Sequence, residues 1–179
     1  MIKQMMESMM VGKSEEVVTR HSLVALHTTT SNVVSASNSP AALDCSVLLV
    51  EDNLVNQRLG IRLLEKLGCR ATIANNGLEA IEKWMHSEYD IILMDCQMPQ
   101  MDGYTATREI RKLEKDQGRI PIIAMTANAM PGDKEKCLES GMDDFLSKPV
   151  DTAKLKTAIH LWFAARKGQK ALVDLVSGR

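Results

Sequence analysis

Aromatic residues are scarce in this chain of 179 residues, at 3% of the sequence. That supply is too small for the stacking surfaces on which single-stranded nucleic acids bind. An excess of positive charge is also missing, because 22 basic side chains face 23 acidic ones and leave a net charge of −1. The chain therefore lacks the general attraction to phosphate backbones that nucleic-acid-binding domains show. We expect no nucleic-acid partner.

Long hydrophobic runs are absent as well. The longest aliphatic stretches, 47–50 and 91–94, span four residues each, whereas a bilayer crossing takes roughly 20 apolar residues. The Met-rich start carries Lys3 and Glu7 and has no apolar core like that of a secretory signal. These features predict a cytoplasmic protein with no membrane segment in this chain.

Cysteine spacings typical of metal or redox sites are not found. Four cysteines lie far apart in the sequence, without a C-x-x-C pair: Cys45, Cys69, Cys96 and Cys137. Such scattered thiols are typical of a reduced intracellular chain. A Gly-rich phosphate loop of the form GxxxxGK[ST] is also missing, so a nucleotide is not the expected ligand.

The composition changes near residue 45. Residues 28–39 read TTTSNVVSASNS, and nine of these twelve are Ser, Thr or Asn. A segment this polar cannot bury enough apolar surface to offset the entropy of ordering, so we interpret it as a linker. We predict an N-terminal extension and linker over 1–44, a folded domain over 45–165, and a short C-terminal tail over 166–179.

Within that domain, short apolar runs alternate with segments of helical periodicity. Strands are predicted at 47–50, 70–74, 90–94, 121–125 and 144–146. Helices are predicted over about 53–67, 77–86, 104–115, 131–140 and 152–165. Five strands alternating with five helices predict an α/β fold, a doubly wound parallel sheet with helices on both faces.

Apolar spacing also predicts one face of each of the first two helices. In the first helix, apolar residues recur every four positions after a cap at Asp52 or Asn53 and before a stop at Gly68. These residues are Val55, Leu59, Leu63 and Leu67. In the second helix, the residues on one face are Leu78, Ile81 and Met85.

Charged and polar side chains follow the predicted strands. Glu51 and Asp52 come after the first strand, Asp95 after the third, Thr126 after the fourth and Lys148 after the fifth. The carboxyl ends of parallel strands meet at one edge of the sheet, where ligands bind in such folds. Three carboxylates this close would repel one another, and a hard divalent cation with oxygen ligands removes the conflict. We therefore predict an Mg²⁺ site, with Mn²⁺ as the alternative metal.

The charges of this predicted site also balance. Three carboxylates contribute −3, Mg²⁺ contributes +2 and Lys148 contributes +1, which sums to zero. A site of this kind is suited to receiving a phosphoryl group rather than to binding a nucleotide.

The same residues carry a family resemblance. The sequence contains four blocks in this order: VEDN at 50–53, MDCQMPQMDG at 94–103, AMTANAM at 124–130 and SKPV at 147–150. Together they resemble the receiver domain of response regulators. Their sequences are most similar to those of receivers attached to hybrid sensor histidine kinases. The resemblance runs from about Val47 to Phe163 and includes Asn56-Gln57. It implies a flavodoxin-like sheet in the order 2-1-3-4-5 and a phosphorelay function with a histidine kinase or a histidine phosphotransfer domain as partner.

The resemblance also implies a role for each site residue. Asp95 matches the phosphoacceptor aspartate, Asp52 the direct metal ligand and Glu51 its neighbour, which acts through a metal-bound water. A further metal ligand falls on the backbone carbonyl of Gln97. The switch and phosphoryl-stabilising positions match Thr126, Lys148 and the aromatic Phe145, and Pro149 matches a proline whose preceding peptide bond is cis.

Each of these residues has a plainer explanation when it is taken alone. A Glu-Asp pair before a helix is usually a cap, and an aspartate before a Pro/Gly loop usually belongs to turn chemistry, as we also expect for Asp102. Phe145 alone would be an ordinary core residue. The functional interpretation depends on their joint position at one edge of the predicted sheet.

The chemical alternative is a haloacid-dehalogenase-like phosphatase, which also uses an aspartyl phosphate and Mg²⁺. Its DxDx[TV] motif needs a second aspartate where this chain has Gln97, which disfavours turnover of external substrates. We expect instead a signalling domain that catalyses only its own phosphorylation and dephosphorylation.

Two further expectations concern partners. Leu54, Val55 and Arg58, at the start of the first helix, are predicted to form an apolar patch that contacts a phosphotransfer domain. The chain is expected to be a monomer or weak dimer. It is also expected to be a fragment or a truncated relative of a hybrid histidine kinase, since the segment around His21 resembles the region that joins kinase cores to receivers.

Overall fold

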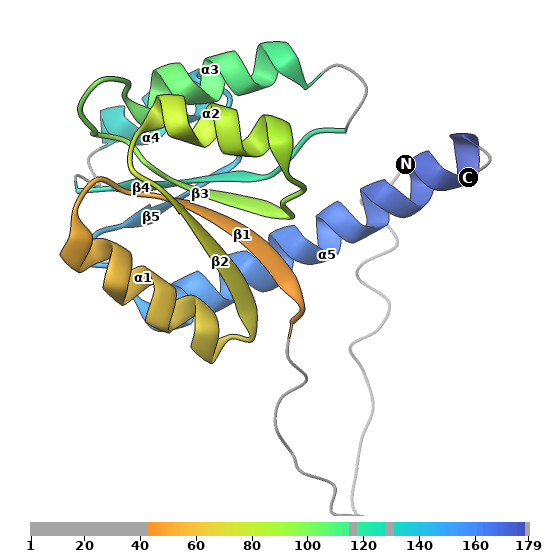
Figure 1. Ribbon diagram of the computed structural model, residues 1–179, viewed down its shortest axis with the longest axis horizontal. Coiled ribbons are helices and arrows are strands. Elements are labelled where there is room, and N and C mark those ends of the chain that lie inside the picture. The colour runs from red at the N-terminus through yellow and green to blue at the C-terminus, as the bar shows by residue number, and fades with distance from the viewer. Residues whose placement is uncertain (1–42, 115–117, 128–130, 178–179) are drawn as a thin grey trace, which may run out of the picture. The chain divides into compact units, whose positions relative to one another are not determined.

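Five parallel strands form the sheet at the centre of the fold, in the order β2-β1-β3-β4-β5 (Figure 1). The strands are β1 (Cys45–Val50), β2 (Cys69–Ala74), β3 (Ile91–Asp95), β4 (Ile122–Thr126) and β5 (Asp144–Ser147). The helices between and after them are α1 (Leu54–Lys66), α2 (Gly77–His86), α3 (Gly103–Leu113), α4 (Pro131–Glu139) and α5 (Thr152–Ser177). The predicted fold class and strand order are confirmed.

This computed structural model describes residues 43–114, 118–127 and 131–177, all within one compact unit, Asn38–Arg179. The predicted extension and linker over 1–44 lie outside the described residues, apart from the last two positions. That part of the domain division stays a prediction.

Helices cover both faces of the sheet, with α1 and α5 on one face and α2, α3 and α4 on the other (Figure 1). Alternate residues of β1 supply the two cores. Leu48 and Val50 belong to the cluster with residues of α2, α3 and α4, whereas Val47 and Leu49 belong to the cluster with α1 and α5. A strand buried on both faces explains why its sequence is continuously apolar.

Helix α1 begins and ends with the residues expected from the sequence. The Asn53 side chain caps the helix by accepting hydrogen bonds from the backbone N–H groups of Val55 at 2.9 Å and Asn56 at 3.4 Å. Gly68 follows the helix with a φ of 76°, a left-handed conformation that glycine adopts without strain. The chain then enters β2 directly.

The apolar residues that recur every four positions in α1 do not all pack against the core. Val55 and Leu59 are 73% and 49% exposed, while Gln57, Leu63 and Leu64 are buried. At the start of the helix the buried position is Gln57, and Val55 is exposed, as the predicted partner patch requires. The first two turns of α1 leave apolar side chains in solvent.

In helix α2 the predicted apolar residues also differ in exposure. Leu78 and Met85 are 52% and 57% exposed, and the helix instead buries Ala80 and Trp84 against the sheet. Of the three predicted apolar residues, Ile81 packs against the same core cluster.

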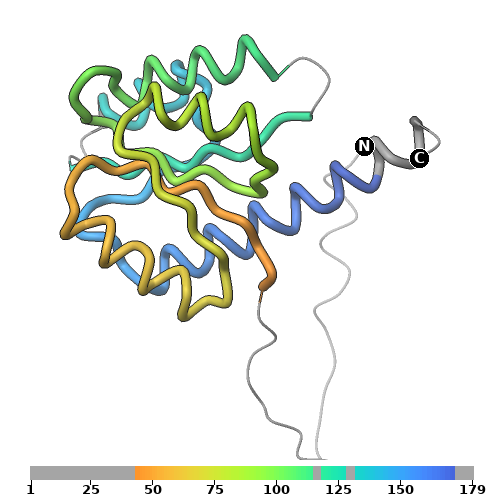
Figure 2. Tube along the Cα trace, viewed as in Figure 1, coloured from red at the N-terminus to blue at the C-terminus, as the bar shows by residue number. Residues whose placement is uncertain are grey.

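Helix α5 continues to Ser177, twelve residues past its predicted end at Ala165. Arg166 is buried, and its Nη1 donates a hydrogen bond to the backbone carbonyl of Arg119 at 3.2 Å. One turn later, the Lys170 ammonium lies 3.5 Å from Asp90. These contacts hold the extended helix beside the segments that lead into β3 and β4, and Figure 2 shows its trace continuing as one helix.

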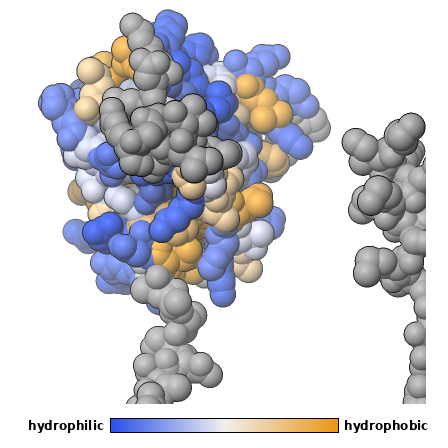
Figure 3. All heavy atoms as spheres, turned by 90° about the vertical axis from the view of Figure 1, so that its right-hand side faces the viewer, coloured by the Kyte–Doolittle hydropathy of each residue, from blue (hydrophilic) through white to orange (hydrophobic). Residues whose placement is uncertain are grey.

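The surface seen in Figure 3 is mostly hydrophilic, with hydrophobic residues gathered in small separate patches. In the part of the chain that the structure describes, no helix is long and apolar enough to cross a membrane.

Candidate functional site

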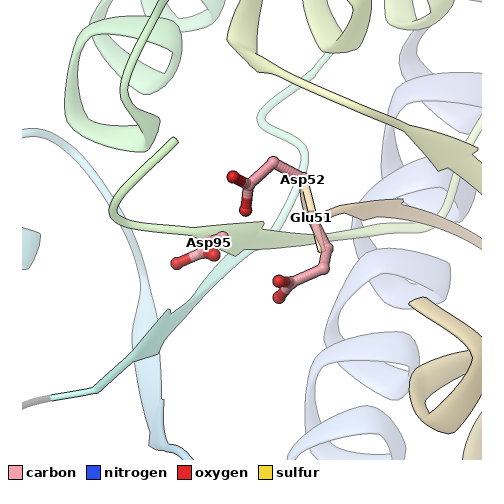
Figure 4. Close-up of side chains that lie close together, drawn as sticks. All are labelled: Glu51, Asp52 and Asp95. Carbon is pink, nitrogen blue, oxygen red and sulfur yellow. The ribbon is translucent and has the colours of Figure 1, made fainter. Parts of the chain in front are cut away.

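Three carboxylates meet where β1 and β3 end. Glu51 and Asp52 follow β1, and Asp95 is the last residue of β3 (Figure 4). Carboxylate oxygens of all three residues lie within 4.8 Å of one another. Glu51 and Asp95 are buried, at 2% and 5% exposure, whereas Asp52 is exposed. The predicted convergence of these residues is therefore present in the fold.

Lys148, in the loop after β5, connects two of these carboxylates. Its Nζ donates to Asp95 Oδ2 at 2.6 Å and to Glu51 Oε2 at 2.7 Å. These are charge-assisted hydrogen bonds between groups that are mostly shielded from water, and such bonds are stronger than neutral ones. The lysine thereby links the end of β5 to the ends of β1 and β3.

Burial and pairing act in opposite directions on the ionisable groups of the site. Burial raises the pKa of the Asp95 carboxyl above its ordinary value, although the hydrogen bond from Lys148 opposes the shift. Burial lowers the pKa of the Lys148 ammonium, but its hydrogen bonds to Asp95 and Glu51 outweigh this effect, and the net pKa is raised. Lys148 therefore stays charged at neutral pH.

The donor set fits a hard divalent cation. With Glu51, Asp52 and Asp95 ionised and Lys148 protonated, the four side chains sum to −2. Oxygen ligands and a residual charge of −2 suit Mg²⁺, which binds proteins through one or two carboxylates and keeps several waters. The exposed Asp52 gives such a hydrated ion access from solvent.

A network of side-chain amides is hydrogen-bonded to the backbone of Glu51. Gln57 is buried, and its Nε2 donates to the backbone carbonyl of Glu51 at 2.7 Å and to Asn75 Oδ1 at 2.9 Å. Asn75 in turn donates to Glu79 at the start of α2. The sequence analysis assigned no role to Gln57 or Asn75, and the signal available for Gln57 was the pair Asn56-Gln57 in the family resemblance.

Gln97 lies two residues beyond Asp95, in the loop after β3. Its backbone N–H donates to Asp95 Oδ1 at 3.1 Å, which helps to fix the aspartate side chain. The role of its carbonyl as a metal ligand stays a prediction.

Gly103 brings the start of α3 very close to the end of β3. A Cβ atom at this position would lie 2.1 Å from the backbone oxygen of Asp95 and 2.8 Å from Met94 Cγ. Only glycine allows this approach. The Asp102 side chain caps α3 by accepting from the Thr105 N–H at 2.7 Å, as expected from the sequence.

The other residues expected at the site lie on β4, on β5 and just after β5. Thr126 ends β4 with 6% exposure, and its backbone carbonyl accepts from the Lys148 N–H at 2.7 Å. Phe145, in β5, is half-buried against the core, and Lys134 Nζ lies 5.4 Å from the centre of its ring. The peptide bond between Lys148 and Pro149 is cis, the arrangement that the resemblance implies.

The predicted partner patch lies beside these carboxylates on α1. Leu54 is 65% exposed and Val55 is 73% exposed, and Arg58 is also exposed. A cavity of about 90 Å³ opens next to this patch. It is lined mainly by α1, the sheet and the start of α5, and its lining includes Asn56, Leu59, Glu51, Lys148, Pro149 and Leu155.

Comparison with known proteins identifies the family. The family model described as "Response regulator receiver domain" matches residues 47–160. The chain belongs to this family. The receiver thus has the fold and the acidic strand ends of a domain of two-component phosphorelays, and the family resemblance predicted from the sequence is confirmed.

Curated relatives of this receiver are hybrid histidine kinases. Hybrid signal transduction histidine kinase B of Dictyostelium discoideum is 47% identical over 117 residues, covering 60% of this chain and 6% of the relative. Hybrid signal transduction histidine kinase I of the same organism is 48% identical over 120 residues, covering 64% of this chain and 7% of the relative. The chain thus spans only a small part of the length of these relatives.

Solved structures of receiver domains are similar to this one. The receiver domain of a sensor histidine kinase from Pseudomonas aeruginosa PAO1 has a TM-score of 0.62 and 48% identity, covering 67% of this chain and 98% of that one, and its magnesium ion is coordinated in the active site cleft. A Saccharomyces cerevisiae receiver domain, crystallised with a histidine phosphotransfer signaling protein, has a TM-score of 0.64 and 36% identity, covering 68% of this chain and 90% of that one.

Proposed function

We propose that this receiver accepts a phosphoryl group from a phosphohistidine donor onto Asp95 in an Mg²⁺-dependent reaction. The observation that carries the proposal is the buried Asp95 carboxylate, bound by Lys148 and within 4.8 Å of the Glu51 and Asp52 carboxylates. The magnesium-bound relative from Pseudomonas supports the choice of metal. Mn²⁺ has the same preference for oxygen ligands and is the alternative.

The residues that would hold the metal are Glu51, Asp52, Asp95 and the backbone carbonyl of Gln97. When bound, Mg²⁺ neutralises charge on the equatorial oxygens of the transferred phosphoryl group. A carboxylate oxygen of Asp95 attacks phosphorus as the bond to the donor imidazole nitrogen breaks, so the imidazole leaves with the bonding electron pair and an acyl phosphate forms. Lys148 pairs with the phosphoryl oxygens and stabilises the charge that Asp95 gains.

Phosphorylation would also change the conformation of the domain. The product carries roughly one more negative charge than the carboxylate it replaces. The Thr126 hydroxyl donates a hydrogen bond to the phosphoryl group and draws the end of β4 inward. Phe145 moves into the space that is vacated, and the surface formed by α4, β5 and α5 shifts between two states.

The proposed partner is a histidine phosphotransfer domain or the corresponding domain of a histidine kinase. Leu54, Val55 and Arg58 would contact its helical surface, because docking must place the donor imidazole in line with Asp95. The yeast receiver crystallised with a histidine phosphotransfer protein supports this class of partner. We further propose that the chain is a cytoplasmic fragment or truncated relative of a hybrid kinase, a monomer or weak dimer without a nucleic-acid partner.

The phosphoacceptor assignment is tested with Asp95→Asn. The amide has the same shape as the carboxylate but is a poor nucleophile, so the variant should fold and take up no phosphoryl group. The measurement is the mass increase after incubation with a small acyl or amido phosphate and Mg²⁺, with thermal unfolding as the folding control. Phosphoryl uptake by Asp95→Asn at the wild-type rate would refute the assignment.

The same incubation separates the receiver from a phosphatase. A phosphomonoester is offered in place of the small phosphodonor, and release of inorganic phosphate is followed. A receiver should not turn over the ester, because Gln97 cannot serve as the general acid of a phosphatase. Repeated turnover would favour the phosphatase.

The partner patch is tested by replacing Leu54 with glutamate. This change places a charge in the apolar patch and should slow phosphotransfer from a phosphotransfer domain without changing labelling by a small phosphodonor. Leu113→Glu is the matched control, since Leu113 is 43% exposed at the end of α3, on the other face of the sheet. Equal slowing with both donors would mean that Leu54→Glu damages the site, and the interface assignment would fail.

A further inference from the structure

The side chain of Asn56 contacts one of the acidic residues directly. Its Nδ2 donates to Glu51 Oε1 at 2.8 Å. The same oxygen receives a longer bond from the Asn53 N–H at 3.4 Å, while the other oxygen of Glu51 receives the bond from Lys148 at 2.7 Å. The Glu51 carboxylate is therefore held between α1 on one side and Lys148 on the other.

Asn56 occupies the third position of α1, where a different residue type is commonly found. In a capping box, a Glu or Gln at this position accepts a hydrogen bond from the N–H of the cap residue. Here the Asn53 N–H points to Glu51 instead, and position 56 supplies a donor rather than an acceptor. A glutamate at position 56 would add a fourth carboxylate beside Glu51, Asp52 and Asp95.

We propose that Asn56 is a positioning residue that sets the orientation of Glu51 for metal binding. The inference rests on the proposed function only in taking Glu51 as one of the residues that hold Mg²⁺. Without the Asn56 amide, Oε1 keeps only the 3.4 Å contact with the Asn53 N–H, and the 2.7 Å bond from Lys148 dominates the position of the carboxylate. Glu51 then turns toward Lys148 and presents its oxygens less favourably to the metal.

The test is a calorimetric titration with Mg²⁺ alone, comparing wild type with Asn56→Ala. Residues that orient metal ligands typically contribute about 10- to 100-fold in affinity, and since Asn56 is exposed we expect a loss of about 5- to 10-fold. Thermal unfolding without metal should show a modest loss of stability, because the buried Glu51 Oε1 loses its 2.8 Å donor.

Asn53→Ala is the matched control. It removes the cap of α1 and should lower stability, but it keeps the Asn56 donor and the Asn53 backbone N–H, so Mg²⁺ affinity should remain at the wild-type value. If Asn53→Ala loses as much affinity as Asn56→Ala, the effect is loosening of the first helical turn and the proposal is wrong. Unchanged affinity in Asn56→Ala also overturns it.

A second readout distinguishes positioning of the metal ligand from damage to the phosphoacceptor. With a small phosphodonor, Asn56→Ala should need about 5- to 10-fold more Mg²⁺ for half-maximal labelling, while the rate at saturating Mg²⁺ stays within about 2-fold of wild type. A lower saturating rate with an unchanged Mg²⁺ requirement would refute the proposal. The Mg²⁺ titration does not depend on phosphorylation, so failure of the proposed function would appear separately, as labelling of Asp95→Asn.

Discussion

Replacing Lys148 with methionine should strongly destabilise the metal-free receiver. Methionine keeps most of the length of the side chain but removes the ammonium that binds both Glu51 and Asp95. These carboxylates are 2% and 7% exposed at their side chains, and Lys148 itself is 21% exposed. The variant leaves two buried negative charges without their cation, close to the third carboxylate of Asp52.

The size of the effect follows from these contacts. Removing one partner of a buried ion pair costs about 3–5 kcal/mol, because the remaining charge stays desolvated. Part of that cost is recovered, since the ammonium no longer has to be taken out of water, and Lys148 retains some solvent contact. We therefore expect the free energy of unfolding to fall by about 3 kcal/mol, the lower end of that range.

The assay is urea unfolding with a chelator present and again with saturating Mg²⁺. Mg²⁺ should stabilise Lys148→Met more than it stabilises wild type, because the variant has one more uncompensated negative charge at the site. Lys112→Met is the control, since Lys112 pairs with Glu109 at 67% and 41% side-chain exposure, and such pairs on helices contribute only about 0.2–0.5 kcal/mol. If Lys148→Met is as stable as wild type without metal, or gains no more from Mg²⁺, the electrostatic account of the site is wrong.

Three further predictions concern the same region. Asp52→Ala should weaken Mg²⁺ binding in a calorimetric titration and leave the metal-free protein as stable or more so, because like-charge repulsion is removed; a sharp fall in its metal-free melting temperature would contradict this. Gly103→Ala should lower the free energy of unfolding in urea by about 3 kcal/mol or more, because the new Cβ would lie 2.1 Å from the Asp95 carbonyl oxygen. The control is Gly132→Ala, which should not change stability because a Cβ there has nothing within 4 Å. Equal stabilities of the two variants would refute the prediction. Burial raises the pKa of the Cys96 thiol to about 12, so the thiol stays neutral as the pH rises to 9. Iodoacetamide should therefore modify Cys96 only after unfolding, as measured by mass spectrometry. Rapid labelling of Cys96 in the folded protein would contradict this prediction.

Much of the fold followed from local sequence patterns. Strand β3 was predicted because Ile91–Met94 is continuously apolar, as a strand covered on both faces must be. Parallel strands have their carboxyl ends at the same edge of the sheet. The sequence alone therefore predicted that Asp95 lies near Glu51 and Lys148. The structure confirms that placement, while the chemical roles of these residues stay proposals.

Other features could not be derived from local patterns. Val55 and Leu59 keep the apolar spacing of a buried face, yet they are exposed because α1 packs through Leu63 and Leu64 instead. A periodic pattern shows which side chains could be buried together, but it does not identify the surface that will cover them. The sequence predicted an apolar patch at the start of α1, but the exposure of Leu59 one turn later is set by how the helix packs.

Contacts between distant segments set the remaining features. The sequence by itself determined which residues carry charge, where strands and helices alternate, and that acidic residues lie at the carboxyl ends of β1 and β3. Only the tertiary structure decided that Lys148 bonds to two of the carboxylates, that Asn56 turns back to Glu51, and that the thiols of Cys96 and Cys137 lie 3.9 Å apart across 41 positions of sequence. Side-chain hydrogen bonds depend on tenths of an ångström and on angles, and these are set by the packing of the helices on the sheet rather than by the local chain.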